Sequence, residues 1–275
     1  MKTDRVMTNV GVIGAGRMGT PIIGHLVRKG FATQVFDLDA AKAGAVKGLG
    51  AKWAGSLEAL AAESEAILIC VGFDREVQEL LAKGGPLRKA RPGTIVAILS
   101  TIHPRTVQRL ADEAEGSGLI VVDSTVCRGG EAADEGTLLS FVGGTTEVVA
   151  RLTPVLRAYS ADVVHTGGVG TAQVAKAANN LIMWACLVAD HEGLALAHHY
   201  GADIEALRKS LLLSSCANGP LEKWGTQTMA WAEDDMAIVA QMAAEAGVAL
   251  PQAGVNREIC RVLKPKRYKL EQYGR

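Results

Sequence analysis

The sequence lacks an excess of either charge. Its 29 Lys and Arg residues balance its 29 Asp and Glu residues, so the formal net charge is zero. A neutral chain offers no general attraction to a polyanion, and we therefore expect neither nucleic acid nor an anionic membrane surface as a partner. The basic cluster from Lys264 to Lys269 is interpreted as a solvated segment near the end of the chain.

Cysteine is scarce and shows no pairing pattern. There are five cysteines, an odd number, and no two of them stand at the spacing of metal ligands: Cys70, Cys127, Cys186, Cys216 and Cys260. This usage is typical of a reducing compartment rather than of a disulfide framework. We expect a cytoplasmic protein without a metal site.

Long uninterrupted apolar runs are also missing. Gly11, Gly14 and Gly16 break the first apolar stretch, so we expect no signal peptide. The most apolar segment, Leu181–Leu196, contains the charged pair Asp190 and Glu192. It is shorter than the roughly 20 apolar residues that span a bilayer. A buried helix is therefore expected there, and no membrane is expected as a partner.

The length and the apolar content favour two domains with large cores. A chain of 275 residues is long for one domain, given about 150 residues for each. Through residue 165, short β-branched runs alternate with helical stretches such as Pro21–Lys29 and Thr106–Glu115. This alternation predicts an α/β fold with a doubly wound, mostly parallel sheet. The expected strands are Val10–Ile13, Thr33–Phe36, Ala66–Val71, Ile95–Leu99, Leu119–Asp123, Leu139–Val142 and Val163–His165.

After Gly170 the strand pattern stops. Residues 171 to about 200 read as one long helix, apolar nearly all round, which we expect to be buried on several sides. Shorter helices are expected to follow at Ile204–Leu213, Leu221–Ala230, Asp235–Ala246 and Ala253–Leu263. We therefore predict a first domain over residues 1–166 and an all-α domain over residues 167–275.

Three glycines stand between the first expected strand and the first expected helix. Gly14 suits a tight turn, Gly16 lets the backbone approach a pyrophosphate, and Gly19 permits close packing of helix and strand. The helix N-terminus then offers free N–H groups to the phosphates. The pattern predicts a Rossmann-type dinucleotide site, in which we also include Arg17 and Met18.

Asp37 ends the second expected strand, about twenty residues further on, where a ribose-binding acid is expected. A carboxylate there accepts hydrogen bonds from the ribose 2′-OH and repels a 2′-phosphate. No Arg or Lys follows it directly. We therefore favour NAD over NADP as the cofactor, and we interpret Asp39 as a helix N-cap.

Four blocks together carry a family resemblance. They are the glycine block, the segment Ser100-Thr-Ile-His-Pro104, the segment Asp123–Gly129 with its trailing Gly136–Leu138, and the segment Gly167–Asn180. In this order they resemble the β-hydroxyacid dehydrogenases, the relatives of 3-hydroxyisobutyrate dehydrogenase. The resemblance covers nearly the whole chain and implies a nucleotide-binding domain followed by a helical domain that begins with a long interdomain helix. It also implies a homodimer or homotetramer.

The same resemblance implies an oxidoreductase that transfers a hydride between nicotinamide and a small β-hydroxyacid or its semialdehyde. Lys176 and Asn180 fall in its catalytic block, four residues apart, so they share one helix face. A partly buried lysine can exchange the hydroxyl proton, and as an ammonium it can stabilise an oxyanion. Asn180 can orient that oxygen or the lysine. The implied substrate loop, for a small carboxylate, is Cys127, Arg128 and Gly129.

Two of these residues have alternative interpretations. Thr101 lies near the nicotinamide ribose, or it caps the following helix ahead of Pro104. Arg128 grips a substrate carboxylate, or it points to solvent or pairs with Glu131.

The sequence also departs from the family pattern. Cys127 replaces a substrate-contacting serine, Arg128 replaces a glycine, Ala172 replaces a glycine, and Asp234 replaces a lysine. Two alternative functions stay open: imine reduction on the same scaffold, and a catalytically degraded dinucleotide sensor, which the changes at Cys127 and Asp234 suggest.

Overall fold

The computed structural model describes residues 7–274; residues 1–6, where the first predicted domain begins, and Arg275 lie outside the described residues. Contacts divide the chain into two compact units, Met1–Lys176 and Ala177–Arg275. The division predicted after residue 166 falls earlier, within the last strand of the first unit. The first turn of the long helix is bound to the sheet.

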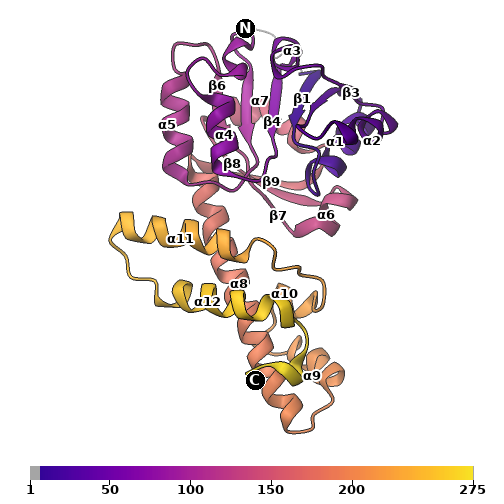
Figure 1. Ribbon diagram of the computed structural model, residues 1–275, viewed down its shortest axis with the longest axis vertical. Helices are drawn as coiled ribbons and strands as arrows, with labels where there is room; N and C mark the ends of the chain where they lie inside the picture. The colour runs from indigo at the N-terminus through magenta and orange to yellow at the C-terminus, as the bar shows by residue number, and fades with distance from the viewer. Residues whose placement is uncertain (1–6, 275) are drawn as a thin grey trace. The chain divides into compact units, whose positions relative to one another are not determined.

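The first unit is built on a nine-stranded sheet with the order β3-β2-β1-β4-β5-β6-β8-β7, in which β9 also pairs with β8 (Figure 1). The pairs from β3 to β6 are parallel, whereas β8 is antiparallel to β6 and β7. The predicted doubly wound, mostly parallel sheet is confirmed. Its strands are β1 (Asn9–Ile13), β2 (Ala32–Phe36), β3 (Lys52–Trp53), β4 (Ala66–Ile69), β5 (Ile95–Ile98), β6 (Ile120–Asp123), β7 (Val126–Cys127), β8 (Leu138–Gly143) and β9 (Ser160–Gly167).

Two hydrophobic clusters cover the two faces of this sheet. Leu68 of β4 joins the cluster with α1, α2, α6 and α7, whereas its neighbours Ile67 and Ile69 join the cluster with α3, α4 and α5. Successive side chains of a strand point to opposite faces, so a strand covered on both sides is apolar throughout. The helices are α1 (Gly19–Arg28), α2 (Ala43–Gly48), α3 (Leu57–Glu63), α4 (Asp74–Leu81), α5 (Pro104–Ala114), α6 (Gly129–Glu135) and α7 (Thr146–Leu156).

The second unit is helical, as predicted. The long helix α8 (Thr171–His199) begins in the first unit and continues into the second. It is followed by α9 (Ile204–Leu211), α10 (Gly219–Glu222), α11 (Ala232–Ala246) and α12 (Pro251–Leu263), of which the last two pack side by side (Figure 1). Leu187 and Leu194 of α8 are buried, but Ile182 and Leu196 are 63% and 62% exposed in the single chain. The helix is therefore buried on fewer sides than we expected.

The helix predicted over Leu221–Ala230 is wrong. Only the single turn Gly219–Glu222 is helical, and the chain then enters an irregular loop. Gly225 has φ of 94° and Met229 has φ of 57°, both in the left-handed region, which ends a right-handed helix. The Tyr268 hydroxyl accepts a hydrogen bond from the Gln227 N–H, so a contact distant in sequence holds this loop.

Among residues 7–274, no helix combines the length and the apolarity that a membrane crossing requires.

Within the second unit, His191 of α8 binds the segment that follows α12. It is 1% exposed; its Nδ1 lies 2.7 Å from the Leu187 carbonyl oxygen, and the Tyr268 N–H lies 3.1 Å from its Nε2. A ring that donates from Nδ1 and accepts at Nε2 is neutral. Burial lowers the pKa of His191. In the folded chain His191 therefore stays neutral at pH values where it is protonated in the unfolded chain, which takes up this proton below about pH 6.5.

We expect the free energy of unfolding of the second unit to decrease as pH falls from about 6.5 towards the lower folded pKa of His191, because the contribution of this histidine is lost over that range. The loss should be about 1.4 kcal/mol for each pH unit between the unfolded and folded pKa values. Urea unfolding at pH 7.5 and 5.5 measures this, and tryptophan fluorescence reports it because Trp184, Trp224 and Trp231 lie in this unit. The matched variant His191→Gln lacks the titrating group. Equal pH dependence in the two proteins would contradict the assignment.

Candidate active site

The glycine loop leaves β1 and enters α1 in a conformation that only small residues allow. Gly14 has φ of 100°, and a Cβ there would collide with the Cys70 carbonyl oxygen. A Cβ on Gly19 would collide with the Gly14 carbonyl oxygen, whereas a Cβ on Gly16 would meet nothing within 4 Å. The outer glycines therefore make the turn and the packing. The backbone at Gly16 stays open, which is what a phosphate group at a helix N-terminus needs.

A cavity of about 370 Å³ lies at the carboxyl ends of β1, β2 and β4. In a parallel sheet, ligands bind at this edge, where the strand order changes direction. β1 is that point, since β2 and β4 flank it. The lining residues include Gly14, Gly16, Asp37, Lys42, Val71 and Glu79.

Asp37 is held firmly at the rim of this cavity. Its carboxylate accepts hydrogen bonds from the N–H of Ala15 at 2.7 Å, the N–H of Asp39 at 2.9 Å and the ammonium of Lys42 at 2.9 Å. Burial opposes ionisation, but the bonds from Lys42 and the two N–H groups outweigh it and lower the pKa of Asp37. The Lys42 contact was not predicted. Asp39 caps the following turn by accepting from the Ala41 N–H, which confirms the predicted N-cap.

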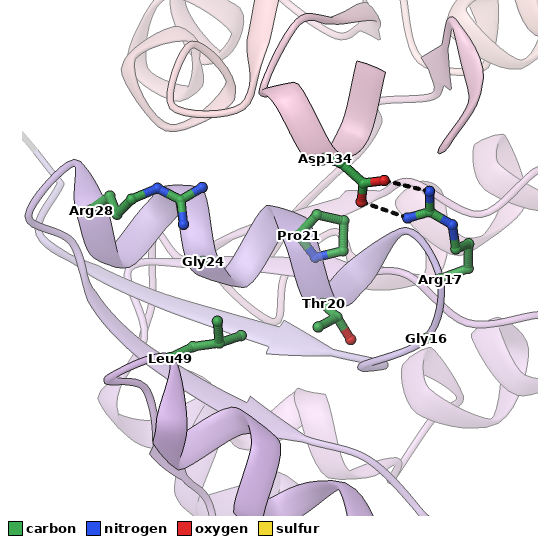
Figure 2. A pocket seen from close by; sticks show the side chains of 8 residues that line it. All are labelled: Gly16, Arg17, Thr20, Pro21, Gly24, Arg28, Leu49 and Asp134. Carbon is green, nitrogen blue, oxygen red and sulfur yellow. Dashed lines mark hydrogen bonds and ion pairs between the residues drawn. The ribbon is translucent and has the colours of Figure 1, made fainter. Parts of the chain in front are cut away.

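Arg17 and Met18 lie on the far side of the glycine loop. The Arg17 guanidinium makes two hydrogen bonds to Asp134 of α6, at 2.7 and 2.6 Å (Figure 2). This pair borders a second hollow of about 560 Å³ along α1, which Thr20, Pro21 and Arg28 also line (Figure 2). Met18 packs against the hydrophobic cluster on that face of the sheet. The loop is therefore braced against α6 through Arg17.

The N-terminus of α8 rests on a buried carboxylate. Asp123, the last residue of β6, is fully buried; its Oδ1 accepts the Gly170 N–H at 2.8 Å and its Oδ2 accepts the Gln173 N–H at 2.9 Å. These donors are among those that a helix start leaves without intrahelical partners. Burial raises the pKa of Asp123, although the bonds from the N–H groups favour the carboxylate.

Two further side chains fasten the same helix turn to the sheet. The Gln173 amide accepts the Ile102 N–H at 3.0 Å and donates to the Ser100 carbonyl at 2.8 Å. The Thr125 hydroxyl donates to the Ala172 carbonyl at 3.0 Å. The loops after β5 and β6 are thus bound to α8.

Thr101 lies in the loop after β5 and is half-buried. The side chain that caps α5 belongs to His103, which accepts the Arg105 N–H. The alternative in which Thr101 caps this helix is therefore wrong.

Lys176 projects from the second turn of α8 onto β7, the short strand after β6. Its Nζ donates to the Val126 carbonyl at 2.8 Å and lies 3.9 Å from the Cys127 Sγ. The structure therefore brings two of the predicted site residues together. Asn180, one turn further along α8, is buried and accepts a hydrogen bond from the Asn179 amide at 3.0 Å.

Arg128 and Gly129 follow directly. Arg128 has φ of 86°, and its guanidinium binds Asp162 at 2.6 Å and the Thr137 carbonyl at 3.0 Å. This corrects the expectation of a side chain that points to solvent or pairs with Glu131.

Three residues of the site were not predicted from the sequence: Asp123 and Gln173, which support α8, and Lys42, which lines the cavity. Both Asp123 and Gln173 stand within the motif blocks, but their partners are about fifty or more residues away. Lys42 could have been found from its position five residues after the acid, at the end of the turn that Asp39 caps. Within residues 7–274 no group of three or more His, Cys, Asp or Glu side chains is arranged to hold a metal ion.

Two protein families match the chain. Residues 9–168 match the NAD-binding domain of 6-phosphogluconate dehydrogenase. Residues 170–272 match the family described as the NAD-binding domain of NADP-dependent 3-hydroxyisobutyrate dehydrogenase. The two matches meet near the start of α8 and together extend over most of the chain.

Individual proteins are also similar. The 3-hydroxyisobutyrate dehydrogenase of Pseudomonas aeruginosa is 33% identical over 219 residues, 78% of this chain and 72% of that protein. The NAD-dependent L-serine dehydrogenase of the same organism is 30% identical over 217 residues, 78% of this chain and 73% of that protein. The structure of Mycobacterium tuberculosis 3-hydroxyisobutyrate dehydrogenase with L-serine has a TM-score of 0.86 at 23% identity, covering 95% of each chain. This structural likeness shows a shared fold.

We expect Asp123→Asn to destabilise the first unit by about 1–3 kcal/mol, because an amide turns an NH₂ group towards one of two buried N–H donors. Denaturant unfolding measures the loss. Asp203 is the matched control, since it caps α9 on the exposed surface by accepting the Ala206 N–H. Asn caps as well as Asp, so Asp203→Asn should change little. Equal effects of the two substitutions would contradict the role of Asp123.

Proposed function

The chain belongs to the β-hydroxyacid dehydrogenase family, and from this premise we propose that it transfers a hydride between NAD(H) and a small β-hydroxyacid or its semialdehyde, with Lys176 as the acid–base residue. It is an NAD(P)-dependent oxidoreductase that acts on CH–OH groups. The observation that carries the proposal is the placement of Lys176, whose Nζ is held on the Val126 carbonyl beside Cys127.

The proposed chemistry follows from that placement. When bound, the nicotinamide ring supplies or accepts the hydride. In the reducing direction the Lys176 ammonium stabilises the oxyanion and gives it a proton, and in the oxidising direction the neutral amine takes the hydroxyl proton. The Val126 carbonyl accepts one ammonium hydrogen, which orients the others. Asn180 orients the same oxygen from the next turn of α8.

The remaining site roles are also part of the proposal. The backbone from Cys127 to Gly129 holds the substrate carboxylate, and Thr101 lies beside the nicotinamide ribose. The backbone at Gly16 receives the pyrophosphate, and Gly14 and Gly19 shape the turn and the helix packing that hold it there. Small hydroxyacids are the proposed substrate class because the similar proteins include 3-hydroxyisobutyrate, L-serine and 2-(hydroxymethyl)glutarate dehydrogenases.

We propose NAD rather than NADP on the strength of Asp37. Its ionised carboxylate at the cavity rim accepts hydrogen bonds from a ribose 2′-OH and repels a 2′-phosphate. Lys42 holds the carboxylate in place and partly offsets its charge. Because one matched family is described as NADP-dependent, this choice needs its own test.

We further propose a homodimer or homotetramer in the cytoplasm. The exposed apolar side chains of α8, Ile182 and Leu196, support self-association. The odd number of cysteines supports a reducing compartment.

We expect Lys176→Ala to lower kcat on a hydroxyacid with NAD⁺ by roughly 10²–10⁴-fold, because it removes the proton-transfer group. NADH affinity, measured by fluorescence titration, should stay within about twofold, because Lys176 holds the substrate oxygen rather than the cofactor. Lys209→Ala, an exposed lysine of α9, is the matched control. Near-normal turnover of Lys176→Ala would contradict the assignment.

A wild-type chain that binds NADH tightly yet oxidises no member of a broad hydroxyacid panel would favour the sensor instead, and turnover confined to imines would favour the imine reductase.

We expect Asp37→Ser to lower kcat/KM for NAD⁺ by about 10–100-fold, the value of a lost charged hydrogen bond. It should also raise kcat/KM for NADP⁺, since Lys42 is then left to face the 2′-phosphate. Asp39→Ser keeps a good N-cap and is the matched control. An unchanged ratio of the two cofactors in Asp37→Ser would contradict the choice of NAD.

A further inference from the structure

Arg128 occupies a backbone conformation that its side chain disfavours. Its φ and ψ are 86° and −1°, which makes it one of three non-glycine residues with positive φ among those described. Glycine, which the family pattern has at this place, adopts this conformation freely. Strained residues that persist at a binding loop are held by their surroundings, so the contacts of the Arg128 side chain must hold this backbone in place.

The guanidinium binds one residue of β9 and the residue that precedes β8. Its Nη2 lies 2.6 Å from the Asp162 Oδ2 in β9, and its Nη1 donates to the carbonyl of Thr137, the residue before β8, at 3.0 Å. The strand register explains this reach. Cys127 of β7 pairs with Leu139 of β8, which in turn pairs with Asp162 of β9. The side chain thus extends from the end of β7 across the start of β8 to β9.

The residues just before Arg128 are those that Lys176 contacts. The Val126 carbonyl accepts the Lys176 ammonium, and the Cys127 Sγ lies 3.9 Å from it. We infer that Arg128 is a positioning residue whose contacts with Asp162 and Thr137 fix the segment Val126–Gly129, which comprises β7, Arg128 and the first residue of α6 and is called the loop below, against Lys176. This inference rests on the proposed function for its kinetic consequence, although the loop contacts exist independently of it.

The guanidinium suits this task better than an ammonium. Exposed ion pairs contribute little when each stands alone. Here the planar guanidinium holds two acceptors, one in β9 and one just before β8, a geometry that a lysine does not reproduce. The contacts also restrict the backbone. A glycine at position 128 would adopt the same φ without strain, but it would have no side chain to hold the loop to Asp162 and Thr137.

The test compares Arg128→Gly, Arg128→Lys, Asp162→Asn and the double variant Arg128→Gly/Asp162→Asn in the full chain. The first readout needs no activity. Cys127 is 5% exposed, so its alkylation by iodoacetamide, followed by peptide mass spectrometry, reports opening of the loop. Cys260, 1% exposed in the second unit, is the internal buried control, and the exposed Cys216 is the positive control.

We expect Arg128→Gly to keep or raise Tm, because glycine relieves the backbone, and yet to speed Cys127 alkylation about tenfold without affecting Cys260. KM for the hydroxyacid should rise about fivefold or more with a smaller change in kcat and unchanged NADH affinity. Arg128→Lys should change the alkylation rate and KM in the same direction as Arg128→Gly, but by less. Asp162→Asn should act in the same direction, and the double variant should be no worse than Arg128→Gly, because one contact is lost only once.

Two outcomes overturn the inference. Unchanged Cys127 alkylation in Arg128→Gly would show that the side chain does not hold the loop. Effects of Arg128→Gly and Asp162→Asn that simply add would show that the two residues do not act together. A wild-type chain without hydroxyacid turnover would overturn the proposed function, and the alkylation result would still decide whether Arg128 holds the loop.

Discussion

The arrangement of the site depends on the contact between the Asp123 carboxylate and the first turn of α8. An ionised carboxylate buried without partners costs several kcal/mol, and two backbone N–H groups offset part of that cost here. The same contact satisfies donors that the helix start leaves open. It also holds the first turn of α8 at the end of β6. Lys176, less than two turns later, therefore meets the Val126 carbonyl rather than solvent.

The main elements of the fold could be predicted because their signals are local. Strands buried on both faces are continuous apolar runs, and α8 contains no proline. Strands β3 and β7 are only two residues long, too short to show alternation. The false helix at Leu221–Ala230 had a helical composition, but its path is set by left-handed Gly225 and by the distant Tyr268.

The site was predictable to the extent that it follows motifs. The three glycines show their roles in the sequence, because a turn and a close approach exclude a Cβ. The meeting of Lys176 with the loop after β6 was expected only through the family resemblance. The contact of Arg128 with Asp162 joins residues 34 positions apart, and no local pattern encodes it. Such contacts become visible only when the strand register is known.

We propose that the sheet, through Asp123 and the first turn of α8, directs the Lys176 ammonium to the reacting oxygen of a hydroxyacid. A crystal structure of the chain with NAD⁺ and a bound β-hydroxyacid tests it most directly. The account predicts the Lys176 Nζ at about 2.7–3.2 Å from the substrate hydroxyl oxygen, with the Asp123 contacts to α8 intact. A complex in which another side chain contacts that hydroxyl, while Lys176 stays out of its reach, would contradict the account.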